Sequence, residues 1–73
     1  MATKATVIGK MQELANTMKR TGWSRDGENA IWEMASDYNR THDDEIFMCD
    51  YQSDDSEYVN GFMIEDDYWT FEQ

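Results

Sequence analysis

Charge is distributed unevenly along this 73-residue chain, and the acidic part is also the aromatic part. Residues 41–73 contain eleven Asp and Glu, no Lys or Arg, and seven aromatic residues, whereas residues 1–40 contain five acids and six bases. The formal charge is thus +1 before Thr41 and −11 after it, which gives the net charge of −10. Acidic segments that stay disordered are poor in aromatic residues, because they cannot bury enough apolar surface to offset the entropy of ordering. The acidic part is therefore expected to fold into an ordered, negatively charged surface.

The length of the chain predicts one domain with a small core. The single cysteine, Cys49, cannot form an intramolecular disulfide, which excludes a stapled secreted scaffold. The first residues contain no apolar run of the kind that a secretory signal needs. The longest apolar runs, 46–49 and 62–64, are far shorter than a membrane span. We therefore expect a soluble cytoplasmic protein with no membrane partner, located in the host cytosol if a phage encodes it.

The first part of the chain has the apolar spacing of two helices. Apolar residues every three or four positions predict a helix from Thr3 to Thr21, which Gly22 ends after two cationic residues. Ser24 is expected to cap a second helix from Arg25 to about Asn39. Gly27 is expected to weaken the first turn of that helix, because glycine is a poor helix former. The linker is so short that the helices must form a hairpin.

The period of the apolar pattern changes after His42, where alternation indicates strands. A polar turn at 52–56 and an acidic turn at 65–67 separate three such segments. The predicted strands are residues 45–51, 57–65 and 68–72. An alternative register has a hairpin turn at Asn60-Gly61, which is a strong two-residue turn signal.

Both registers predict the α+β class, with two N-terminal helices followed by a small antiparallel three-stranded sheet. The single domain, residues 1–73, would consist of a helical hairpin at 3–40 and an acidic antiparallel sheet at 44–72. The sequence contains no evident repeat or linker.

The sequence contains few residues of the types that catalysis requires. The single histidine and the single cysteine, His42 and Cys49, lie in acidic surroundings, which raise a thiol pKa where a reactive cysteine needs it lowered. Zinc would require several His or Cys ligands, and the alternating oxygen ligands at 50–56 lack the central glycine of a calcium loop. We therefore expect no catalytic residues, no cofactor and no dedicated metal site, and the protein is not expected to be an enzyme.

The carboxylates beyond Arg40 are the remaining functional signal. They cluster at the expected ends of the sheet, where neighbouring strands lie about 4.8 Å apart. Each strand of duplex DNA carries one charge per about 3.4 Å of its axis. The spacing of the carboxylates and the spacing of the phosphates are therefore of the same order. A surface chosen for solubility alone usually intersperses both signs, and this one does not. The residues expected to stand in for phosphates are Asp43, Asp44, Glu45, Asp54, Asp55, Glu57, Glu65, Asp66 and Asp67.

Aromatic residues are numerous for so small a domain. Most are expected to form the core, and Trp32 and Tyr68 are candidates for partly exposed anchors, because Tyr and Trp are enriched at binding hot spots. An aromatic anchor ringed by carboxylates would add affinity that charge alone does not give.

Small size, strong acidity, dense aromatics and the lack of catalytic residues together resemble the functional class of DNA-mimic proteins from phages and mobile elements. That class includes anti-restriction, anti-CRISPR and host-takeover inhibitors. The resemblance covers composition and no motif. It implies an inhibitor that occupies the basic surface of a nucleic-acid-binding protein, which could be a nuclease, CRISPR effector, restriction enzyme, polymerase or nucleoid protein. Such an inhibitor would not itself bind nucleic acid.

The alternative hypothesis is an acidic adaptor or antitoxin-like module that binds a protein through its helices or a sheet edge. Binding of that kind would be driven by apolar contacts and would tolerate high salt. A homodimer is compatible with either hypothesis, because two helices cover one face of the sheet and leave the other uncovered.

Overall fold

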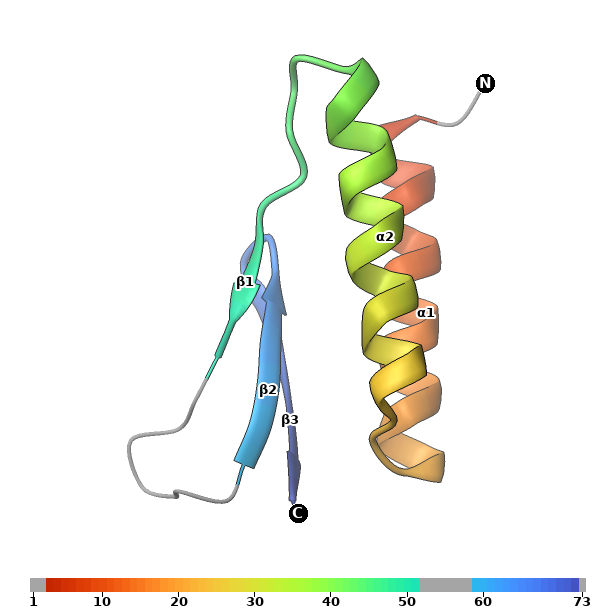
Figure 1. The fold of residues 1–73 in the computed structure, drawn as a ribbon, viewed down its shortest axis with the longest axis vertical. Helices are drawn as coiled ribbons and strands as arrows, with labels where there is room; N and C mark the ends of the chain where they lie inside the picture. The colour runs from red at the N-terminus through yellow and green to blue at the C-terminus, as the bar shows by residue number, and fades with distance from the viewer. Residues whose placement is uncertain (1–2, 52–58, 73) are drawn as a thin grey trace.

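The computed structural model describes residues 3–51 and 59–72. Its elements are helix α1 (Lys4–Thr21), helix α2 (Arg25–Thr41) and the strands β1 (Met48–Asp50), β2 (Val59–Ile64) and β3 (Asp67–Glu72). The two helices lie side by side as one layer and the sheet forms a second layer against them (Figure 1). The predicted α+β architecture, with two N-terminal helices before a three-stranded antiparallel sheet, is confirmed.

The signals for the ends of the helices are also confirmed. Ser24 Oγ accepts a hydrogen bond from the Gly27 N–H at 3.0 Å and so caps α2. At the end of α1, Gly22 has a φ of 104°, and its N–H donates to the Met18 carbonyl at 2.7 Å. Helix α2 continues to Thr41, past its expected end.

Gly27 has a packing role that the sequence did not reveal. A Cβ at this position would lie 2.6 Å from Met18 Sδ and 2.8 Å from Ser24 Oγ. The missing side chain therefore lets the first turn of α2 pack closely against α1. This contact offsets part of the cost of a glycine in a helix.

The three strands pair in sequence order, and both pairings are antiparallel. Strands β2 and β3 are joined by a two-residue turn, Glu65-Asp66, in which Glu65 has a φ of 55°. The alternative turn at Asn60-Gly61 is wrong, since both residues lie inside β2 and pair with β3. Gly61 instead permits close backbone packing, because a Cβ there would lie 2.7 Å from the Tyr51 carbonyl oxygen.

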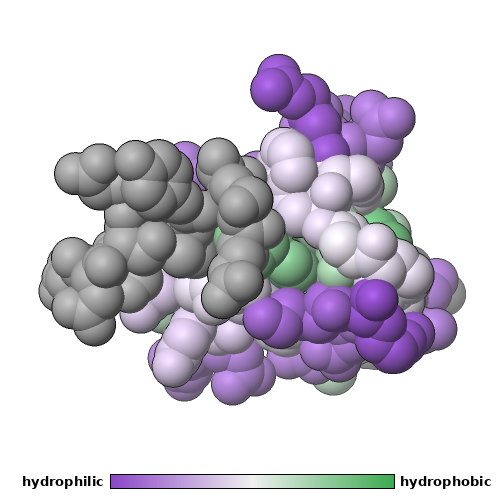
Figure 2. All heavy atoms as spheres, turned by 90° about the horizontal axis from the view of Figure 1, so that it is seen from below, coloured by the Kyte–Doolittle hydropathy of each residue, from purple (hydrophilic) through white to green (hydrophobic). Residues whose placement is uncertain are grey.

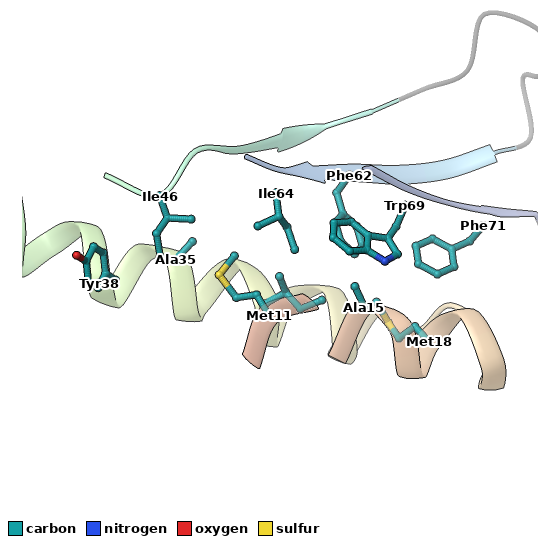
Figure 3. Close-up of a cluster of buried hydrophobic side chains, with 11 residues drawn as sticks. Met11, Ala15, Met18, Ala35, Tyr38, Ile46, Phe62, Ile64, Trp69 and Phe71 are labelled. Carbon is teal, nitrogen blue, oxygen red and sulfur yellow. The ribbon is translucent and has the colours of Figure 1, made fainter. Parts of the chain in front are cut away.

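The core lies between the helices and the inner face of the sheet (Figure 3). The Phe62 ring packs against Trp69 and Phe71, with centroid distances of 5.9 and 5.7 Å. Trp69 Nε1–H donates to Asn16 Oδ1 at 2.9 Å, which satisfies the polar atom of this buried ring. The buried side chains are Met11, Ala15, Met18, Ile31, Ala35, Tyr38, Ile46, Phe62, Ile64, Trp69 and Phe71.

Figure 2 views the molecule from the end that carries the α1–α2 turn. In Figure 2 hydrophobic atoms, in green, appear between the two layers, and hydrophilic atoms, in purple, surround much of them. The apolar material is thus concentrated between the layers at this end.

Candidate protein-binding surface

Two carboxylate clusters lie along the half of the molecule where α1 begins and α2 ends, the first at that end and the second nearer the middle of the long axis (Figure 1). Residues 43–45 belong to the connection after α2, and residues 65–67 include the β2–β3 turn. Lys4 lies between the clusters. Its Nζ is 3.2 Å from Glu65 Oε1, and its charge adds to the hydrogen bond from Tyr38 in lowering the pKa of Asp44. We call these two clusters together the acidic end.

A side-chain amide fixes the connection that carries the first cluster. Asn39 Oδ1 accepts from the Ile46 N–H at 2.7 Å, and Asn39 Nδ2–H donates to the Ile46 carbonyl at 3.0 Å. The amide thus pairs with both backbone groups of Ile46, as a neighbouring strand would. The Ile46 side chain is itself buried in the core. Residues 43–45 are therefore held between two anchored points, the end of α2 and Ile46.

A phenol fixes the same connection from the core side. Tyr38 Oη–H donates to Asp44 Oδ1 at 2.8 Å, and the Tyr38 ring stacks on His42 with centroids 3.9 Å apart. The hydrogen bond from Tyr38 lowers the pKa of Asp44. Burial, followed by the hydrogen bond to Asp44 and its charge, raises the pKa of the Tyr38 phenol. The contact is thus made between a neutral phenol and an ionised carboxylate.

We expect the Tyr38–Asp44 contact to make stability depend on pH. The pKa of Asp44 is lower in the folded chain, so its contribution is present above the unfolded value of about 4 and is lost as the pH falls through the folded value. The pKa of Tyr38 is raised on folding, so its contribution is present below about 10 and is lost at higher pH. Urea unfolding of wild type and Tyr38→Phe should therefore differ near pH 7 and converge as the pH falls through the folded pKa of Asp44.

The neighbouring carboxylate provides the control for this measurement. Asp43 is exposed, and no side-chain hydrogen bond from a described residue to it is seen. In the Asp43→Asn background the effect of Tyr38→Phe at pH 7 should persist, whereas in the Asp44→Asn background it should be largely lost, because Tyr38 then has no carboxylate to bind. Parallel acid limbs for wild type and Tyr38→Phe would show that the contact does not contribute.

The second cluster is fixed by contacts with α1 and with the chain before β1. The Glu65 N–H donates to the Phe47 carbonyl at 2.8 Å, so the turn lies beside that residue. Glu65 Oε1 is shielded from solvent, and Lys4 is its counter-charge. Asp67 Oδ2 accepts from Gln12 Nε2 at 3.3 Å. Both clusters are thus tied to the folded core by specific contacts.

The structure brings together six of the nine carboxylates that the sequence analysis selected. Five of the six are exposed, and Glu65 is half-buried. Among the exposed ones, Asp43, Glu45 and Asp66 make none of the side-chain contacts described above. The other three, Asp44, Glu65 and Asp67, contact Tyr38, Lys4 and Gln12 respectively. The remaining predicted residues, Asp54, Asp55 and Glu57, lie outside the described residues.

The sheet face turned away from the helices carries aromatic and sulfur-containing side chains. Cys49, Met63 and Tyr68 occupy one row across the three strands. Tyr68 is 60% exposed and stacks on Tyr51 with centroids 4.9 Å apart, and Phe47 is 53% exposed. We call these five residues the open face.

The two aromatic residues proposed as anchors have different environments. Tyr68 lies on the open face and is exposed, whereas Trp32 is half-buried on α2. Phe47 is an exposed aromatic residue that the sequence analysis did not select. The sequence feature that could have indicated its exposure is its position between Ile46 and Met48, since both of these turn toward the core.

Basic residues are confined to the helical layer. All six Lys and Arg of the sequence fall within α1 and α2. Two of them reach toward the sheet: Lys4 pairs with Glu65, and Lys19 donates to the Thr70 carbonyl at the β3 edge, 2.5 Å away. The charge asymmetry of the sequence is therefore an asymmetry between the two layers.

A groove of about 420 Å³ also lies along the helices, with apolar walls and charged residues of both signs. It is lined by Val7, Lys10, Met34, Asp37, Tyr38, Thr41 and His42. Its mixed charge and open form distinguish it from the acidic end.

Comparisons with models of protein families, with curated proteins and with solved structures give no significant match. In the described part of the chain, no helix is both long and apolar enough to cross a membrane. Within residues 3–51 and 59–72, no three His, Cys, Asp or Glu side chains come together as metal ligands would.

Proposed function

We propose that this protein is an inhibitor that occupies the basic nucleic-acid-binding surface of another protein and excludes its DNA or RNA. The observation that carries the proposal is the acidic end, where two carboxylate clusters are held by contacts to the core. Charges held in place before binding lose little conformational freedom when a partner engages them. The uneven field of the two layers would also steer the acidic part toward a basic groove.

The proposed partner is a basic protein that handles nucleic acid, such as a nuclease, CRISPR effector, restriction enzyme, polymerase or nucleoid protein. The inhibitor would act in the cytosol where that partner works, and a phage or mobile element is the proposed source. It would not bind nucleic acid, since its surface carries the same sign of charge as the phosphates.

The open face supports a second candidate function, an acidic adaptor or antitoxin-like module. Phe47 and Tyr68 are the exposed large hydrophobic residues of the described chain, and both belong to this face. Binding through the open face alone would depend on apolar burial and would persist at high salt. Salt dependence therefore separates the two candidates.

The test is competition at a purified partner. Affinity capture from the native cytosol identifies a bound basic protein, and labelled duplex or single-stranded nucleic acid is then displaced from that protein by titration. Reversal of two exposed carboxylates, Asp43→Lys with Asp66→Lys, should weaken inhibition by about ten-fold or more at low salt, because both charges face the partner. The wild-type affinity should itself fall steeply with added salt.

The matched control makes the same change of charge on the helical layer. Asp26 and Glu33 are exposed on α2, and Asp26→Lys with Glu33→Lys alters the net charge by the same amount. This variant should inhibit nearly as well as wild type. Equal losses in the two double variants, or a partner that keeps its nucleic acid while bound, would contradict the proposal.

A further inference from the structure

The open face combines exposed aromatic rings with carboxylates at one border. Tyr68 follows the turn residue Asp66 by two positions, and Phe47 follows Glu45 by two. The two segments are joined by the hydrogen bond between the Glu65 N–H and the Phe47 carbonyl. Phe47 therefore lies beside the β2–β3 turn that carries Asp66. Tyr68 lies two positions after Asp66, and its ring stacks on Tyr51 across the open face.

Charge decides which occupant fits this face. A second copy would bring two sheet layers together, and residues 41–73 of each carry a formal charge of −11 and no Lys or Arg. That repulsion opposes a dimer through the open face. A cationic side chain is attracted by the carboxylates, and also by the faces of Tyr and Phe rings.

Among cations, arginine matches this surface better than lysine. A guanidinium group is planar and weakly hydrated, so it can stack on a ring while its N–H groups bind carboxylates. An ammonium group is a strongly hydrated point charge that gains less from a ring at an exposed site. Resting on the function proposed above, we propose that the open face binds arginine side chains of the basic partner, which stack on Tyr68 and Phe47 beside Glu45 and Asp66.

The experiment compares two labelled peptides, one of eight arginines and one of eight lysines, titrated with the intact protein and followed by fluorescence anisotropy. The arginine peptide should bind roughly five-fold more tightly than the lysine peptide at equal salt. Tyr68→Ala and Phe47→Ala should each reduce that preference, and together they should abolish it. Affinity for the lysine peptide should change less than about two-fold in these variants.

The control is an aromatic residue of the helical layer. Trp32 is half-buried on α2, and Trp32→Leu keeps an apolar side chain there while removing the ring. This variant should retain the preference for arginine. Amide NMR shifts of the wild-type protein with the arginine peptide should be largest in β1, β2 and β3 and small in α1 and α2.

The outcomes separate this inference from the proposed function. If the two peptides bind equally and Asp43→Lys with Asp66→Lys weakens both, the inference is overturned while charge-driven binding stands. If neither peptide binds, or the charge-reversed variant binds both as well as wild type, the inference and the proposed function fail together. A preference for arginine that survives loss of both rings would also overturn the inference.

Discussion

Phe62→Ala is expected to lower the free energy of unfolding by about 3–5 kcal/mol. Phe62 is fully buried and packs between Trp69 and Phe71, so truncation leaves a cavity where the sheet meets α1. A domain of this length has a total stability of only roughly 4–11 kcal/mol. The loss is therefore a large fraction of the whole. Urea unfolding followed by tryptophan fluorescence measures it.

The control for this core prediction lies on the opposite face of the same sheet. Tyr68 is 60% exposed, and Tyr68→Ala should cost less than about 1 kcal/mol. If the two truncations destabilised the chain equally, the sheet would not present one buried and one open face. The described packing of Figure 3 would then be wrong.

Asn39→Ala is expected to cost about 1–3 kcal/mol, because it leaves the N–H and the carbonyl of Ile46 without their partner. The same change should release residues 43–45 and weaken inhibition of the partner. Hydrogen exchange at the Ile46 amide should accelerate, since that N–H donates to Asn39 Oδ1 at 2.7 Å in the folded chain.

Two further variants check that this effect belongs to the amide pairing. Asn29 is an exposed residue of the same helix, and Asn29→Ala should change stability by less than about 0.5 kcal/mol. Asn39→Asp keeps an acceptor for the Ile46 N–H and loses the donor, so it should fall between wild type and Asn39→Ala. An Ile46 amide that exchanges at the same rate in all variants would contradict the role assigned to Asn39.

The parts of the fold that could be predicted from sequence depend on local chemistry. Helix α1 follows from its apolar period, and Ser24 and Gly22 set a helix start and a helix stop through their own backbone groups. The alternation of apolar residues after His42 also predicted strands there, and the buried Ile46 and Ile64 follow that alternation. These signals are carried by residues close together in the chain.

The features that were missed depend on contacts between distant residues. Asn60-Gly61 does not form a turn, because both residues pair with β3. This pairing keeps Phe62 on the core side. From sequence, Gly27 is only a poor helix former. Its packing role depends on the close approach of Met18, which the structure shows. The sequence does not indicate that Asn39 will pair with Ile46. An asparagine near a helix end most often caps the helix or forms a turn.

Phe47 shows why the candidate surface was only partly predicted. Composition indicated more aromatic residues than a small core holds, but it did not identify which ones remain outside. The structure shows that the helices cover only one face of the sheet, and Phe47 and Tyr68 are exposed while Trp32 is half-buried. Which sheet face the helices cover depends on how the two layers pack together. The sequence of a single segment therefore does not reveal it.

The confinement of Lys and Arg to the helices gives the molecule an electric dipole moment directed across its two layers. The field of a basic protein exerts a torque on such a dipole within about one Debye length, roughly 8 Å at physiological salt. Rotation during approach would turn the helices outward before contact, so encounters that begin in the wrong orientation can still be productive.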